Sequence, residues 1–146
     1  MRSSWIPECP GLRPAAASSW LTAFPFYWPI GIVTAAVHAG RRGMLDGVVP
    51  ATIDALRRAG AVPGDLWAAV GPSICGSCYE VPDHMRTLSA QREPACASRT
   101  SWGTPGLDVA AGVIAQLERA GVGHISAGGW CTYEDPRFYS FRREGT

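Results

Sequence analysis

The stretch GIVTAAVHAGRRG, residues 31–43, decides the fold that the sequence predicts. Its first eight residues are rich in β-branched side chains and lie between glycines, which is typical of a buried β-strand. A glycine-rich turn follows, and the sequence then predicts an amphipathic helix that ends at Gly60, with Arg57 and Arg58 in its last turn, where cations suit the helix dipole. The apolar residues that recur at helical spacing in it are Leu45, Val48, Val49, Ile53 and Leu56.

The alternation of strand and helix continues towards the C-terminus. LWAAVG, residues 66–71, indicates a second buried strand, which Pro72 ends. Residues 82–99 are weakly patterned and indicate one short helix and a loop. Because 146 residues have room for one modest core, we expect a single domain of the α/β class.

A second helix and a third strand complete the pattern. Asp108 is placed to cap a helix that runs through Leu117 and ends at Gly121. The segment VGHIS, residues 122–126, indicates the strand. The sequence shows no internal repeat.

Charge and cysteine content limit the functional classes. Thirteen basic and twelve acidic residues give a net charge of +1, without the basic stripe that nucleic-acid binding requires, so we expect no nucleic-acid partner. Five cysteines form an odd number without the dense spacing of a secreted disulfide scaffold. We therefore expect a cytoplasmic protein.

One charge-free segment, Pro14–Val37, allows a different interpretation. It could be a membrane span flanked by Arg41 and Arg42, which would make the chain a noncatalytic membrane-anchored module. Pro25 and Pro29 interrupt the apolar run, however, so we expect no membrane partner.

Three ordered motifs together resemble one known family. They are HAGRRG at 38–43, GPSICGSCYEV at 71–81 and CTYEDPRFYSFRR at 131–143. Members of the laccase-domain family, also called multicopper polyphenol oxidase-like, typically have HAGWRG, GPxIGPCCYEV and CT…FFSYRR in this order. The resemblance covers residues 31–146 and implies a layered α/β/β/α sandwich that is incomplete at both ends.

The resemblance also implies an activity and a metal. The family's activity is phosphorolysis of adenosine, inosine and methylthioadenosine, with adenosine deamination alongside, so the implied partners are a purine nucleoside and phosphate. The family holds zinc with two histidines and one cysteine, and the older oxidase label implies copper. His38 matches the second histidine of this set. The sequence leaves the oligomeric state open.

Other motif positions imply catalytic and binding roles. Arg42 matches the family arginine and is the candidate for catalysis and phosphate binding, whereas Arg41 replaces the family tryptophan. Arg142 and Arg143 match the terminal arginine pair, which could bind phosphate or anchor the last strand, and we favour anchoring for one of them. A solvated turn is the structural alternative for Arg42.

Two motifs also supply candidates with structural alternatives. Tyr79 and Glu80 could orient the substrate, or could be structural residues after a turn. Cys131 is a catalytic candidate by motif, and a buried thiol acting as a small hydrophobe is the alternative. Cys75 and Cys78 form C-G-S-C, which suggests a redox pair or half a zinc site, but Cys75 falls where the family has glycine, so the spacing is interpreted as accidental.

The family cysteine is missing from its expected strand. That region, Ser18–Pro29, has no recognisable pattern, yet its codons, read from each third base with free synonymous choice, can encode VMADCLPVLLAD, a normal version of the strand. The cysteine codon would straddle Thr22 and Ala23, so we infer a frameshift near Ile30 and treat residues 1–30 as non-homologous. Translation of the DNA in all frames tests this hypothesis.

The incomplete set of family ligands limits the activity expected of the 146-residue chain. With one legible family ligand of three, we expect negligible zinc occupancy and negligible phosphorylase activity. A different enzyme class, a Cys-His hydrolase that uses Cys78 or Cys131 with His38, remains an alternative. His84 and His124 match no motif and are predicted to lie on the surface.

Overall fold

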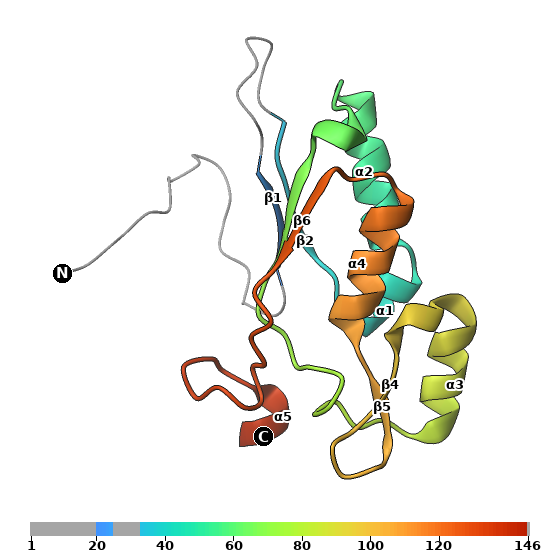
Figure 1. The fold of residues 1–146 in the computed structure, drawn as a ribbon, viewed down its shortest axis with the longest axis vertical. Coiled ribbons are helices and arrows are strands. Elements are labelled where there is room, and N and C mark those ends of the chain that lie inside the picture. Colours follow the sequence, from blue (N-terminus) through green and yellow to red (C-terminus); the bar gives the residue numbers. More distant parts are fainter. Residues whose placement is uncertain (1–19, 25–32, 146) are drawn as a thin grey trace, which may run out of the picture.

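The centre of the protein is a four-stranded mixed sheet, seen in a computed structural model that describes residues 20–24 and 33–145 (Figure 1). The order of the strands is β2-β1-β3-β6. β1 pairs antiparallel with β2 and with β3, and β6 pairs parallel with β3. The strand bounds are β1 Trp20–Phe24, β2 Ala35–His38, β3 Trp67–Val70 and β6 His124–Ala127.

This pairing brings three strand ends to the same edge of the sheet. Because β1 runs opposite to both of its neighbours, β2 and β3 run in the same direction, and β6 follows β3. The carboxyl ends of β2, β3 and β6 therefore share one edge, which is where open α/β sheets usually bind ligands. All three family-like motifs start at or beyond these ends.

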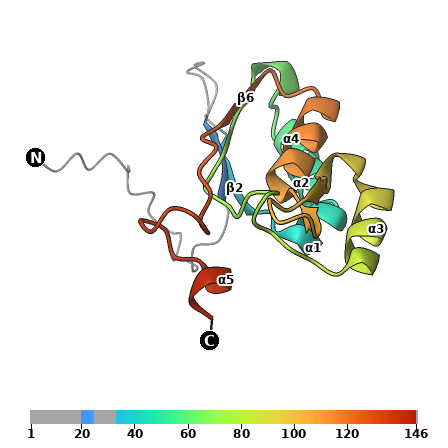
Figure 2. The same ribbon diagram turned by 60° about the horizontal axis from the view of Figure 1, so that its bottom comes forward.

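Helices cover one face of the sheet (Figures 1 and 2). They are α1 Arg41–Leu45, α2 Val48–Arg58 and α4 Val109–Arg119. The core lies between this helix layer and the sheet, because alternate strand residues such as Ala68 of β3 turn towards Leu56 and Leu117. The α/β class predicted from the sequence is confirmed, since α1, α2 and α4 form a helix layer on the four-stranded sheet.

The first helical region differs in detail from the prediction. The apolar face of α2 is buried as expected, with Val49, Ile53 and Leu56 no more than 4% exposed. Residues expected to form a glycine-rich turn instead form α1, and Gly47 separates the two helices with a φ of 84°. A left-handed backbone at this position favours glycine, so the chain changes direction there rather than continuing one helix.

The cap and close packing of α4 follow from its sequence. Asp108 Oδ1 accepts a hydrogen bond from the N–H of Ala111 at 2.8 Å, which confirms the predicted cap. Gly112 allows α4 to approach α1, because a Cβ at this position would clash with Met44 Sδ. The end at Gly121 also agrees with the prediction, since α4 and its C-cap Ala120 directly precede this glycine of φ 76°.

The segment between β3 and α4 contains the predicted short helix and an unpredicted hairpin. The helix is α3 Asp83–Arg92, and the hairpin joins β4 Ala97–Arg99 to β5 Pro105–Leu107. The hairpin was not predicted because strands of three residues are too short to show a period in sequence.

The remaining elements are short. Two 3-10 turns lie at Pro63–Asp65 and Pro94–Cys96, and α5 Phe141–Glu144 is the last element.

An ion pair between the buried Glu93 and the exposed Arg119 ties this segment to α4. Glu93 is 1% exposed and accepts hydrogen bonds from both terminal nitrogens of Arg119. These hydrogen bonds hold the pKa of Glu93 below its ordinary value, against the opposing effect of burial.

Most of the predictions for the N-terminal region concern residues outside the described part of the chain. Within residues 1–30 the structure describes only β1, which lies between β2 and β3 although its sequence shows no strand periodicity. The proposed frameshift near Ile30 and most of Pro14–Val37 lie outside the described residues. Among the described helices, none has both the length and the apolar character that crossing a membrane requires.

Candidate functional site

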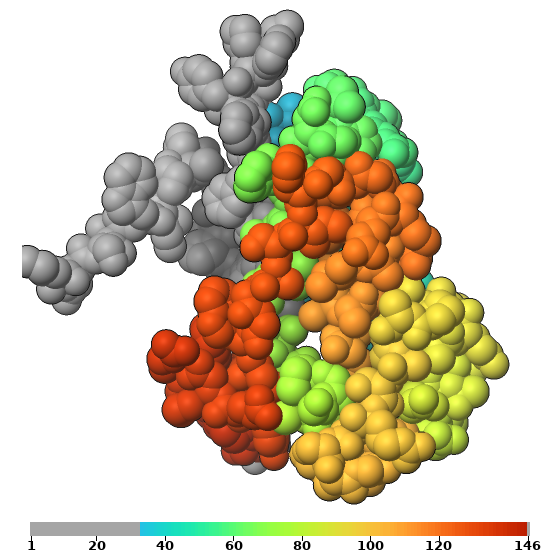
Figure 3. All heavy atoms as spheres, in the orientation of Figure 1, coloured from blue at the N-terminus to red at the C-terminus, as the bar shows by residue number. Residues whose placement is uncertain are grey.

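Two loops that leave the shared sheet edge are tied together by backbone contacts. One follows β3 and carries residues 71–80, and the other follows β6 and carries residues 128–135. Ser73 forms a parallel bridge with Cys131, accepting a hydrogen bond from Thr132 N–H at 3.0 Å and donating its own N–H to Trp130 O at 3.3 Å. Figure 3 shows the C-terminal segment, in red, packed against the green segment that follows β3. The motif that follows β3 and the C-terminal motif therefore meet at this edge, where Cys75 contacts Cys131, 56 residues further along the chain.

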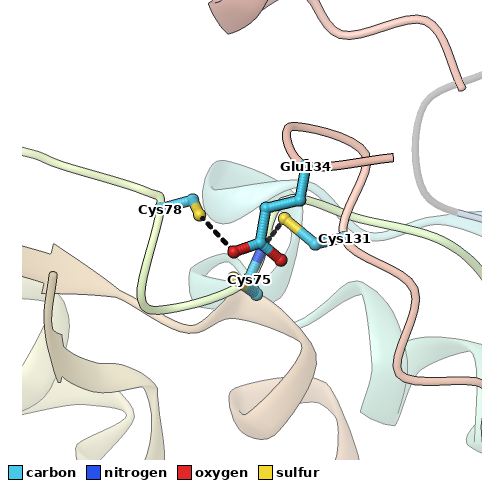
Figure 4. Close-up of side chains that lie close together, drawn as sticks. All are labelled: Cys75, Cys78, Cys131 and Glu134. Atoms are coloured by element: carbon cyan, nitrogen blue, oxygen red, sulfur yellow. Dashed lines mark hydrogen bonds between the residues drawn. The ribbon is translucent and has the colours of Figure 1, made fainter. Parts of the chain in front are cut away.

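These loops bring together four possible metal ligands. The Sγ atoms of Cys75, Cys78 and Cys131 and a carboxylate oxygen of Glu134 all lie within 4.8 Å of one another (Figure 4). Cys78 Sγ donates to Glu134 Oε1 at 3.4 Å, and the N–H of Cys75 donates to Cys131 Sγ at 3.4 Å. Cys78 and Cys131 are buried, Cys75 is half-buried and Glu134 is exposed. We call these residues the Cys3Glu group; they could hold a metal ion.

The three thiols of the group have different proton affinities. Burial raises the pKa of Cys75 and of Cys78 above the ordinary value. Burial also opposes ionisation of Cys131, but hydrogen bonds from backbone N–H groups, that of Cys75 foremost, outweigh it and lower the pKa of Cys131. Cys131 therefore ionises first.

A glycine between the first two cysteines makes their turn possible. The N–H groups of Cys78 and Tyr79 both donate to Cys75 O, at 3.1 and 3.0 Å, and this turn brings the two thiols to one side. A Cβ on Gly76 would lie 2.6 Å from Ser98 Oγ and 2.8 Å from Asp108 Cβ. The turn is therefore packed directly against β4 and the cap of α4.

His38 lies at the same edge but outside the Cys3Glu group. It is the last residue of β2, its side chain is exposed, and a Cβ on Gly40 would lie 3.0 Å from its Nε2. The glycine therefore leaves room for the imidazole over the turn. Within the described residues, the Cys3Glu group is the one set of three or more potential metal ligands, and it does not include His38. The described residues thus do not assemble the two histidines and one cysteine implied by the family resemblance.

Tyr79, Glu80 and Arg142, three of the predicted substrate-binding residues, are in contact. The guanidinium carbon of Arg142 lies 4.8 Å from the centroid of the Tyr79 ring, and its NH1 donates to Glu80 O at 3.4 Å. The Glu80 carboxylate accepts a hydrogen bond from Nε1 of the exposed Trp102 at 2.6 Å. Arg142 and Glu80 are exposed, so their charges are accessible to a ligand.

The remaining motif arginines occupy different settings. Arg42 is exposed on α1, after the strand that ends at His38. Arg143 is half-buried and donates to four backbone carbonyls of its own segment, including Thr132 O at 2.8 Å and Phe138 O at 2.6 Å. These are the anchoring contacts favoured for one of the two terminal arginines. His84 and His124 are exposed, as predicted.

Sequence reasoning missed the Cys3Glu group as a unit. It interpreted Cys75 and Cys78 as accidental spacing, treated Cys131 separately and did not consider Glu134. A signal was present, because C-x-x-C at 75–78 is followed by C-x-x-E at 131–134, and paired ligands two residues apart are typical of thiolate metal sites. The separation of 56 residues hid the pairing.

The fold and the site define an α/β protein in which loops from the carboxyl ends of the strands meet, at the edge where open α/β sheets usually bind ligands. Residues 24–146 match the sequence model of the family described as multi-copper polyphenol oxidoreductase laccase. The chain belongs to this family.

Curated relatives and solved structures agree with this assignment. The chain is 50% identical over 118 residues to a purine nucleoside phosphorylase of Streptomyces coelicolor, covering 81% of this chain and 49% of the relative. It is 42% identical over 114 residues to one of Corynebacterium glutamicum, covering 78% and 46%. The chain thus spans about half the length of the curated relatives it matches.

The structural neighbours have the same fold. A crystal structure of a Neisseria meningitidis protein matches with a TM-score of 0.72 and 29% identity, over 89% of this chain and 53% of that one. A Bacillus licheniformis protein matches with a TM-score of 0.70 and 28% identity, over 86% and 49%.

Proposed function

We propose that this chain contributes to a purine nucleoside phosphorylase, and that the nucleoside and phosphate bind at the carboxyl edge of the sheet. The observation that carries the proposal is the contact of Arg142 with Tyr79 and Glu80, which brings together residues of the motif that follows β3 and of the C-terminal motif. The names of the Streptomyces and Corynebacterium relatives support the reaction class.

The residues at this edge suit the two substrates. Arg142 presents an exposed guanidinium that can pair with a phosphate dianion, and Arg42 supplies a second one after β2. Tyr79 offers an aromatic ring beside this charge, and Glu80 offers a carboxylate that can accept hydrogen bonds from a ribose or purine. Adenosine, inosine and methylthioadenosine are the proposed nucleosides, with adenosine deamination as a companion reaction.

Two further motif residues, Arg143 and Cys131, are not fully exposed at this surface. Arg143 holds the last segment through its four carbonyl contacts, so we assign it to positioning, although phosphate binding was the other prediction. Cys131, with its lowered pKa, lies at the base of the same loop. Its predicted catalytic role stays a prediction.

The family's zinc does not fit the described residues as a His2Cys set, because His38 is not grouped with two further ligands among them. Copper oxidation is the weaker alternative, since His84 and His124 are exposed residues outside any ligand group that the structure describes. We propose a cytoplasmic location because the four described cysteines are free thiols.

Binding and turnover measurements test the proposal separately. Calorimetry with inosine in phosphate buffer should detect binding that Arg142→Ala weakens, while Arg58→Ala, which removes an exposed arginine of α2, leaves it unchanged. No binding by folded protein, or equal loss in both variants, would overturn the proposal.

The turnover assay follows release of purine base from each nucleoside with and without phosphate, and formation of inosine from adenosine. We expect negligible turnover from the 146-residue chain, because its described residues do not complete the His2Cys set. Phosphate-dependent release of base that disappears in His38→Ala would show that the set is complete and contradict this part of the proposal.

A further inference from the structure

We propose that Cys75, Cys78, Cys131 and Glu134 form a binding site for one thiophilic divalent cation of the zinc type, which ties the loop after β3 to the C-terminal segment. This site does not include His38 and goes beyond the proposed nucleoside chemistry. It also replaces the sequence-based expectation of negligible zinc occupancy.

The spacing of the four ligand atoms suits tetrahedral coordination. Zinc binds sulfur at about 2.3 Å and carboxylate oxygen at about 2.0–2.2 Å, so the edges of such a tetrahedron measure roughly 3.5–3.8 Å. Cys78 Sγ and Glu134 Oε1 are 3.4 Å apart, and all four atoms lie within 4.8 Å of one another. Side-chain adjustments of about an ångström would complete the site.

The backbone holds the ligands in place before any ion binds. The turn from Cys75 to Cys78 is closed by two backbone hydrogen bonds, and Gly76 fixes it against Ser98. The second loop is closed by the N–H of Asp135, which donates to Cys131 O at 3.0 Å. Because the Ser73 bridge joins the two loops, cation binding requires little reordering of the chain.

The donor set selects the class of cation. Three sulfur ligands and one carboxylate favour Zn²⁺, Co²⁺ or Cd²⁺ over Mg²⁺ or Ca²⁺, which take oxygen ligands. On binding, the cation replaces the thiol protons, which pass to solvent. One contact already supports the charge of a ligand, since the N–H of Cys75 donates to Cys131 Sγ. Arg143 adds a positive charge to the second loop, where it donates to the carbonyls of Thr132 and Tyr133, the two residues between Cys131 and Glu134 in the sequence.

A cation bound at this site would cross-link the two loops beside the proposed substrate surface. Cys78 directly precedes Tyr79, and Glu134 belongs to the segment that leads to Arg142. A bound cation would therefore restrain both partners of the Tyr79–Arg142 contact.

Titration of the metal-free, reduced chain with Co²⁺ alone tests the proposal. We expect one equivalent to give the thiolate-to-cobalt charge-transfer absorption and the intense visible bands of tetrahedral coordination, and Zn²⁺ to displace it. Removal of second-shell partners already costs about 10–100-fold in affinity, so loss of a direct ligand in Cys75→Ser should weaken binding by at least about 100-fold. Glu134→Gln changes an exposed side chain, carries little risk to the fold and should weaken binding by at least about tenfold.

Two variants serve as matched controls. Cys96→Ala removes a buried thiol outside the group, and His38→Ala removes the family-like histidine. Both should retain the absorption and affinity of the unaltered chain. No charge-transfer band, or affinity unchanged in both Cys75→Ser and Glu134→Gln, would overturn the proposal, as would a loss confined to His38→Ala. Because no nucleoside is present, this result is independent of the proposed phosphorylase function.

Discussion

Arg143→Ala should loosen the C-terminal segment without unfolding the core. The guanidinium donates to the carbonyls of Thr132, Tyr133, Asp135 and Phe138, at distances from 2.6 to 3.2 Å. Hydrogen bonds to a charged group contribute about 1.5–3 kcal/mol each, and these four share two nitrogens. Counting one bond for each nitrogen, and reducing the sum because the side chain is 28% exposed and water can replace part of it, gives about 2–4 kcal/mol.

Amide hydrogen exchange measures this loss at the residues concerned. A loss of about 2–4 kcal/mol corresponds to a fall in protection of roughly 30- to 700-fold, which we expect at the N–H groups of Thr132 and Asp135. The N–H of Val122, which donates to Leu117 O beside the core, serves as the internal control and should be unchanged. Arg143→Lys keeps the charge but presents a single nitrogen, so we expect an intermediate result. Unchanged protection at Thr132 and Asp135 would refute the anchoring role.

Three further predictions concern the core and the substrate surface. Glu93→Gln should lower the free energy of unfolding by about 1–2 kcal/mol in denaturant at neutral pH, because the buried carboxylate loses its ion pair with Arg119, whose exposure lets water replace part of the interaction. The folded-state pKa of Glu93 is lowered, so the carboxylate contributes fully to the free energy of unfolding above its ordinary pKa. This contribution disappears as the pH falls through the lower folded-state pKa. If Glu93→Gln remained less stable than the unaltered chain at low pH, this explanation would be contradicted. Gly112→Ala should destabilise by about 1–3 kcal/mol in the same assay, because its Cβ meets Met44, and a neutral result would mean that α1 and α4 can separate. Arg142→Ala should weaken phosphate binding with no change in the melting temperature, since the side chain is exposed. A lower melting temperature together with the weaker binding would indicate a structural role.

The sequence predicted those elements whose signals are local. The period of Val49, Ile53 and Leu56 predicted the buried face of α2, and Asp108 predicted the start of α4. The prediction of a turn after His38 was wrong, because α1 is only five residues long and its apolar face has no repeating period. The hairpin of β4 and β5 was missed for the same reason.

The candidate site depends on contacts that no local pattern contains. Motif resemblance selected Tyr79 and Arg142 separately, and only the fold shows that they touch. Similarly, Cys78 and Glu134 are 56 residues apart, and the parallel pairing of β3 with β6 brings their loops together. Whether two motifs meet is decided by strand order, which hydrophobic periodicity does not specify.

The carboxyl edge of the sheet is the proposed place of substrate binding. Two-dimensional NMR of the ¹⁵N-labelled chain, titrated with inosine in phosphate buffer, locates the binding surface directly. We predict saturable shifts of the amide signals of residues 38–42, 71–80 and 131–143, with α2 unaffected. Saturable shifts confined to α2, or to any surface away from this edge, would contradict the account.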